Sequence, residues 1–131
     1  MEIISGDYGK FCTAILDYLP VGVIFADAQG KITGINTFAE ELLGLEKEKV
    51  IGRFQKEILW PPVFLDCSDT FSNLVADALD RGIIYDQVEL NALLKGKPGT
   101  LKISTRMLRE GKKCTGVLVF FTDYTLGQIL E

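Results

Sequence analysis

The segment GKITGINTFAEELLG (residues 30–44) changes from strand to helix at one residue, Asn36. Apolar and polar residues alternate before Asn36, and apolar residues recur at helical spacing after it. An asparagine that begins a helix accepts a backbone N–H of the first turn, worth about 1 kcal/mol, and Gly44 suits the left-handed end of a helix. This helix is too short to be stable alone. We therefore expect it to fold back onto a sheet, in an α+β fold.

Two strands should precede this helix. Residues 21–36 contain two β-rich runs joined by Asp27, Ala28, Gln29 and Gly30, a turn sequence typical of a hairpin. A second short helical turn is expected over residues 46–53, ending at Gly52. Residues 54–67 contain two consecutive prolines, which predicts an irregular connector.

The second half of the chain predicts one helix and three strands. Residues 68–82 predict a helix that Gly82 ends. Five apolar side chains share one face of it: Phe71, Leu74, Val75, Ala78 and Leu79. The period then changes to two, in three runs separated by loops at residues 95–99 and 109–113. The run 115–123 is the most hydrophobic, which places it in the middle of an antiparallel sheet.

Residues 8–19 predict an amphipathic helix that Pro20 ends. Its apolar stripe consists of Tyr8, Phe11, Cys12, Ile15, Leu16 and Leu19. The stripe can pack on the chain's own core or on a second copy of the chain, which would make it a dimer contact. The pattern leaves both arrangements open.

Size and composition limit the class of protein. A chain of 131 residues with 47% hydrophobic content is one domain, and no apolar run approaches the roughly 20 residues that cross a bilayer. The N-terminus has no leader-like pattern, so we expect a cytoplasmic protein with no membrane contact. The chain has no histidine, which excludes histidine-dependent catalytic triads and metal sites. We expect no enzyme; the enzymatic alternative would use Asp27 or Asp86 as a general base.

One part of the chain is strongly basic. Between positions 95 and 113, one acid, Glu110, accompanies seven basic residues: Lys95, Lys97, Lys102, Arg106, Arg109, Lys112 and Lys113. They form either a solvated sheet edge or a docking surface for an acidic partner or an anionic ligand. Direct nucleic-acid binding is not expected, because no aromatic residues interleave with these charges and no recognition helix accompanies them.

From about Ile15 to Thr125 the chain resembles a PAS domain, the sensory module of bacterial signalling proteins. The resemblance rests on five features in order: the turn DAQGKI with Gly30, Asn36 followed by Ala39, Gly44, the run VIGR with Gly52, and the closing TDYT. It implies a five-stranded antiparallel sheet with short helices packed on one face, and an N-terminal amphipathic helix outside it. The expected boundaries are 1–19 for that helix, 20–125 for the PAS domain and 126–131 for the start of a linker.

The resemblance also implies a small-molecule pocket between helices and sheet. Periodicity gives its expected lining as Phe25, Ile35, Phe38, Leu42, Phe54, Phe64, Phe71, Leu74, Val75, Leu90, Ile103, Met107, Val119 and Phe121. Each of these side chains could equally be ordinary core packing. The pattern alone does not separate the two interpretations.

The expected ligand is unknown, although some classes are disfavoured. PAS relatives that bind haem commonly use a histidine, which this chain lacks, and no run matches the cysteine motif of flavin-binding photosensors. Cys67 precedes the long helix, as the chromophore-bearing cysteine does in photoactive yellow protein. However, Ala39 stands where an acid that holds the chromophore is expected. Cys67 is therefore expected to be an unreactive thiol. The alternatives are redox sensing at Cys67 and a photoreceptor like photoactive yellow protein, with a chromophore attached to Cys67.

The end of the chain suggests the mechanism. In PAS proteins an Asp-x-Thr motif leads into a linker helix, so Asp123 and Thr125 are expected to fix the angle at which the chain leaves the domain. A C-terminal output module, such as a histidine kinase or the ATPase of an enhancer-binding activator, is expected in the same protein. The sequence thus predicts a sensor that acts as a homodimer, with a ligand-free dimerisation module as the alternative.

Overall fold

The structure, a computed structural model, describes residues 20–58 and 74–125. Its sheet is wholly antiparallel, with the order β2-β1-β5-β4-β3. The strands are β1 (Gly22–Asp27), β2 (Ile32–Ile35), β3 (Val88–Leu94), β4 (Lys97–Glu110) and β5 (Lys113–Asp123). The last strand lies at the centre, so the prediction drawn from its continuous apolar run is confirmed.

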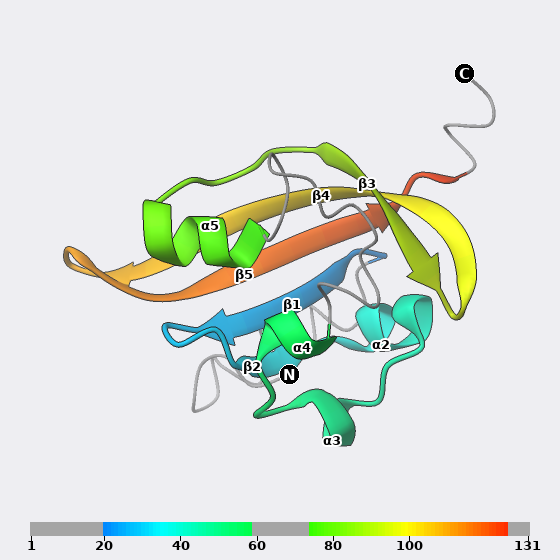
Figure 1. The fold of residues 1–131 in the computed structure, drawn as a ribbon, viewed down its shortest axis with the longest axis horizontal. Coiled ribbons are helices and arrows are strands. Elements are labelled where there is room, and N and C mark those ends of the chain that lie inside the picture. The colour runs from blue at the N-terminus through cyan, green and yellow to red at the C-terminus, as the bar shows by residue number, and fades with distance from the viewer. Residues whose placement is uncertain (1–19, 59–73, 126–131) are drawn as a thin grey trace.

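The described helices lie over one face of this sheet (Figure 1). They are α2 (Thr37–Leu43), α3 (Lys47–Val50), α4 (Gln55–Ile58) and α5 (Leu74–Arg81). The expected α+β arrangement, a five-stranded sheet covered by short helices, is confirmed. The predicted N-terminal helix, most of the connector and the start of the long helix lie outside the described residues.

The β1–β2 hairpin is fixed by its turn. One carboxylate oxygen of Asp27, Oδ1, accepts hydrogen bonds from the backbone N–H groups of Gln29 and Lys31, each at 2.9 Å. The N–H of Gly30 donates to the carbonyl of Asp27 at 3.0 Å. An aspartate that bonds its own following backbone in this way is a common turn device. The hairpin predicted for these residues is therefore present.

The β3–β4 connection is shorter than the predicted loop over residues 95–99. Lys95 and Gly96 have φ angles of 53° and 79°, and Leu94 already pairs with Lys97. Two consecutive residues with positive φ form the tight turn that best fits the twist of a hairpin. Pro98 and Gly99 consequently belong to β4, although their residue types suggest a loop.

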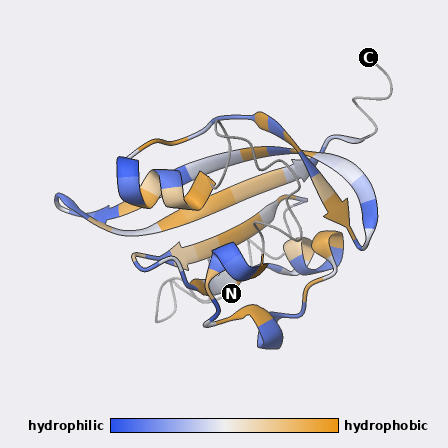
Figure 2. Ribbon diagram, in the orientation of Figure 1, coloured by the Kyte–Doolittle hydropathy of each residue, from blue (hydrophilic) through white to orange (hydrophobic). Residues whose placement is uncertain are grey.

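Side-chain alternation divides the sheet into two faces. The face under the helices is buried in one apolar cluster, which includes Ile24 and Ala26 of β1 and Val117, Val119 and Phe121 of β5. Figure 2 shows the hydrophobic residues concentrated along β1 and β5, and hydrophilic residues at the turn between β4 and β5. The helices therefore cover the apolar side of the two central strands, as burial of that surface requires.

Candidate functional site

Asn36 joins the start of α2 to β1. Its Oδ1 accepts hydrogen bonds from the backbone N–H groups of Ala39 at 3.0 Å and Val23 at 2.9 Å, and its Nδ2 donates to the carbonyl of Val21 at 2.8 Å. The residue is fully buried. The amide of asparagine offers the acceptor and the donor on two separate atoms, so that it can make all three of these bonds at once. The predicted N-cap is confirmed, and Gly44 ends α2 in the left-handed conformation with φ of 70°.

Most of the predicted pocket lining lies within the core between helices and sheet. Seven of these side chains belong to the buried cluster, and Met107 packs against it. The seven are Ile35, Leu74, Val75, Leu90, Ile103, Val119 and Phe121. They pack against one another, so in this structure they act as core residues. Phe64 and Phe71 lie outside the described residues.

Two predicted lining residues lie elsewhere. Phe25 is on the opposite face of the sheet, because its neighbours Ile24 and Ala26 occupy the core face and alternation turns Phe25 away. Phe54 lies at the surface and is 37% exposed, while the next residue, Gln55, is buried. At these two positions the apolar side chain is exposed and the polar one is buried, the reverse of what their residue types predict.

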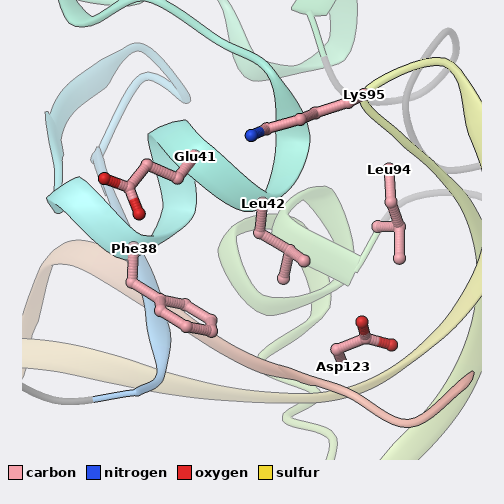
Figure 3. A pocket seen from close by; sticks show the side chains of 6 residues that line it. All are labelled: Phe38, Glu41, Leu42, Leu94, Lys95 and Asp123. Carbon is pink, nitrogen blue, oxygen red and sulfur yellow. The ribbon is translucent and has the colours of Figure 1, made fainter. Parts of the chain in front are cut away.

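Phe38 and Leu42 are half-buried and line a surface pocket of about 350 Å³ (Figure 3). Both belong to α2, as does Glu41, while Leu94 and Lys95 come from the end of β3 and its turn, and Asp123 from the end of β5. Three of the side chains that line the pocket are apolar, and the other three carry charges of both signs. The helical layer and the end of the last strand thus meet at this pocket.

The expected exit residues are hydrogen-bonded to each other and to β4. Asp123 Oδ1 accepts from the backbone N–H of Thr125 at 2.9 Å. Thr125 Oγ1 accepts from the N–H of Thr100 at 3.0 Å, and the N–H of Tyr124 donates to the carbonyl of Thr100 at 2.8 Å. A side chain at Gly99 would collide with Thr125, since an added Cβ would lie 2.8 Å from Oγ1. These bonds fix the direction of the chain through residue 125.

A polar link between α5 and β4 was not predicted. The hydroxyl of Tyr85 donates to Asp77 Oδ2 at 2.7 Å, and Asp77 is only 8% exposed. The hydrogen bond to Asp77, with smaller effects of burial and of the nearby negative charge, raises the pKa of Tyr85. Tyr85 also exchanges hydrogen bonds with Thr105 of β4, at 2.9 Å in each direction. Helical periodicity gave no signal that the acid at position 77 would be buried.

The seven basic residues do not form one patch. Lys95 and Lys97 lie at one end of β4, whereas Arg109, Lys112 and Lys113 lie around the opposite hairpin. A strand of this length separates its ends by roughly 40 Å. Between them, Arg106 forms an ion pair with Asp86 at 3.1 Å, and the Lys102 ammonium lies 4.0 Å from the ring centre of Tyr124. The arrangement fits a solvated sheet surface better than a single docking site.

Among the described residues, no three metal-ligating side chains are grouped as a metal site would require. The same part of the chain contains no helix long and apolar enough to cross a membrane. Cys114 is a half-buried free thiol, while Cys12 and Cys67 lie outside the described residues. The predictions made for Cys67 and for the dimer stripe of residues 8–19 are therefore untested.

Comparison with known proteins supports the resemblance. A family model described as the PAS fold matches residues 16–126. The signal transduction histidine-protein kinase AtoS of Escherichia coli (strain K12) is 28% identical over 114 residues, which make up 85% of this chain and 17% of that kinase. The chain thus spans less than a fifth of this relative.

Solved structures agree on the fold. The PAS domain of a protein from Colwellia psychrerythraea has a TM-score of 0.72 and 21% identity, covering 92% of this chain and 99% of that one. The PAS domain of the Cronobacter turicensis RpfR quorum-sensing receptor, in complex with BDSF, has a TM-score of 0.60 and 18% identity, covering 82% and 96%. With the family model matching most of its length, the chain belongs to the PAS family of sensory domains.

Proposed function

We propose that this PAS domain senses a small molecule and passes the change through a dimer to a C-terminal output module. One observation carries the proposal: Phe38 and Leu42 of α2 line the same pocket as Asp123 at the exit of the domain. A shift of the helical layer therefore reaches the exit motif directly. Asp123 in turn accepts a hydrogen bond from the backbone N–H of Thr125. A change in the shape of the pocket would therefore change the direction in which the chain leaves the domain.

The energetic requirement is modest. A ligand that favours one packing of the helices by about 1 to 3 kcal/mol shifts the population of the two states by 5- to 150-fold. The exit is held by a few hydrogen bonds, each worth about 1 kcal/mol. The coupling free energy is therefore comparable to the free energy of the hydrogen bonds that hold Asp123 to Thr125 in place.

The dimer would use the outer face of the sheet. Two cross-strand pairs lie side by side there, Phe25 with Leu118 and Val23 with Phe120. Phe25, Leu118 and Phe120 are half-buried, whereas Val23 is only 1% exposed. Half-buried apolar side chains on a sheet face that the described helices leave uncovered are typical of an interaction surface. The apolar stripe predicted for residues 8–19 would contribute to the same contact.

Two relatives support the sensory role. The likeness to AtoS suggests a histidine kinase as the output module, and RpfR, a quorum-sensing receptor, has a PAS domain of this fold in complex with BDSF. The ligand of this chain need not resemble BDSF, because the two sequences share only 18% identity.

Native mass spectrometry tests the proposal. The protein, purified from its own host, is weighed before and after denaturation, and an absorption spectrum is recorded. A small molecule that is released on denaturation supports the sensor. A bare dimer mass favours the ligand-free dimerisation module, and a covalent adduct at Cys67 with visible absorption favours the photoreceptor.

A further inference from the structure

Gly99 is the point at which the β3–β4 hairpin touches the exit of the domain. It lies in β4, and its φ is not in the left-handed region, so its conformation does not require glycine. The space around it does. An added Cβ would lie 2.5 Å from Cδ1 of Leu94 and 2.8 Å from Oγ1 of Thr125, closer than Cβ atoms approach other atoms. The side chains of Leu94 and Thr125 therefore meet beside the backbone of Gly99.

Leu94 and Thr125 belong to two different features of the molecule. Leu94 lines the pocket of about 350 Å³ between α2 and the ends of β3 and β5, which we call the α2 pocket. Figure 3 shows the side chains of Leu42 and Leu94 converging on Asp123 in this pocket. Thr125 accepts the hydrogen bond of the Thr100 N–H at 3.0 Å. A displacement of Leu94 away from the pocket thus acts on a residue that holds the exit.

The hairpin also contacts the helical layer. A Cβ added to Gly44, the residue that ends α2, would lie 3.3 Å from Cα of Lys95 in the β3–β4 turn. The end of α2 therefore packs closely on the backbone of this turn. The hairpin touches α2 through Lys95 and the exit through Gly99, and close-packed groups transmit displacements because they compress little.

We propose that Leu94 is the residue that couples the α2 pocket to the exit, and that the coupling requires glycine at position 99. A ligand in the pocket presses Leu94 toward Gly99. The backbone of Gly99 belongs to the sheet, so the side chain of Thr125 yields instead, and its bond to the Thr100 N–H weakens. The inference rests on the proposed sensory function and adds the positioning residue through which that function would operate.

The test fills the α2 pocket from the protein itself, so no ligand has to be known. Leu42→Trp enlarges a side chain that converges with Leu94 in the pocket. We expect hydrogen exchange at the Thr100 amide, followed by nuclear magnetic resonance, to become about fivefold faster, as for the loss of one hydrogen bond. The Ile32 amide, which donates to the carbonyl of Arg53 at 2.8 Å, should keep its rate. No change at Thr100, or equal acceleration of both amides, would overturn the proposal.

Leu94→Ala, combined with Leu42→Trp, shows whether the effect passes through Leu94. With alanine at position 94 the tryptophan has room and no longer presses on Thr125. The Thr100 amide of the double variant should therefore exchange at the rate found in Leu94→Ala alone. Additive effects of the two substitutions would overturn the role of Leu94.

Leu79→Trp is the matched control. Leu79 is also a half-buried leucine on a helix, and it lines a separate pocket of about 190 Å³ between α4, α5 and the β1–β2 turn. The larger side chain should leave exchange at the Thr100 amide unchanged. Faster exchange there would show that the amide responds to any enlargement in the helical layer, which contradicts the proposal.

Gly99→Ala tests the same contact without a change in α2. Its Cβ takes the space between Leu94 and Thr125, so the Thr100 amide should again exchange about fivefold faster. Urea denaturation verifies that the variant is folded. An unchanged rate in the folded variant would show that Thr125 does not depend on the space at Gly99, and the proposal would fail.

The coupling and the sensory function can fail separately. If native mass spectrometry finds a retained small molecule while the effects of Leu42→Trp and Leu94→Ala are additive, the sensory function stands and the coupling through Leu94 fails. If the double variant behaves as expected and no molecule is retained, the coupling stands and the sensory function is the part that is contradicted.

Discussion

At the scale of single residues, Asn36 supports more of the fold than any helix cap alone would. Its side chain bonds two backbone N–H groups and one carbonyl, from α2, from β1 and from the residue before β1. Substitution by alanine leaves these three groups buried without partners. We expect Asn36→Ala to lower the free energy of unfolding by about 2 to 4 kcal/mol, measured by urea denaturation.

Asn36→Ser serves as the control for this prediction. Serine keeps an acceptor suited to the N-cap but is too short to reach both Val23 and Val21, so its loss of stability should be intermediate. If serine and alanine cost the same, the contribution of Asn36 does not come from the cap.

The exit motif gives a second prediction at this scale. Thr125→Val keeps the shape of the side chain and removes the acceptor for the N–H of Thr100. Hydrogen exchange at the Thr100 amide should become about fivefold faster, as expected for the loss of about 1 kcal/mol. Thr122→Val, two strand positions before Tyr124, is the control and should leave that amide unchanged. Unaltered exchange in Thr125→Val would show that the threonine does not hold the exit.

At the scale of secondary-structure elements, Tyr85 and Asp77 fasten α5 to β4. The bond between them is 2.7 Å long, and one partner is almost wholly buried. Tyr85→Phe removes the donor and leaves Asp77 with only the longer contact of 3.7 Å to Arg81. We expect a loss of about 1 kcal/mol at neutral pH, measured by urea denaturation.

The same bond makes stability depend on pH. The hydrogen bond to Asp77 raises the pKa of Tyr85 above its usual value near 10. Below that value the phenol is protonated in the folded and unfolded chains, and the stabilisation is fully present. As the pH rises through the folded-state pKa the stabilisation is lost. The wild-type protein should therefore lose stability above about pH 10 more steeply than Tyr85→Phe, and parallel curves would contradict the assignment.

The elements differ in how well the sequence predicts them. Strand and helix periods reflect which side chains are buried, so residues 30–44 and the central strand follow directly from the pattern. The turn at Lys95 and Gly96 was expected to be longer, because proline and glycine after it suggest a loop. Asp77 is buried because Tyr85 bonds to it, and Gln55 is buried because it lies between α5 and the β1–β2 turn. Both depend on contacts with other elements. Local periodicity contains no information about either.

At the scale of the whole molecule, the two faces of the sheet have different partners. The helices cover one face completely enough to bury Ile24, Val119 and Phe121, whereas Phe25, Leu118 and Phe120 on the other face remain half-buried. The basic residues do not form a charged patch over these apolar side chains, since they are distributed along β4 and at both of its ends. The outer face thus carries three half-buried apolar side chains that the described helices do not cover, which favours it as the dimer surface.

Leu118→Glu tests this surface. The substitution places a carboxylate beside Arg106, its cross-strand partner, so the folded monomer should tolerate it. In a dimer that buries the outer face, the added charge would be desolvated without enough compensation, and the dissociation constant should rise by at least about tenfold. Analytical ultracentrifugation measures the change, with urea denaturation to verify the fold. Ile84→Glu, at an apolar residue that is 48% exposed in the connection between α5 and β3, is the matched control. Equal dissociation constants for the two variants would place the dimer contact elsewhere on the chain.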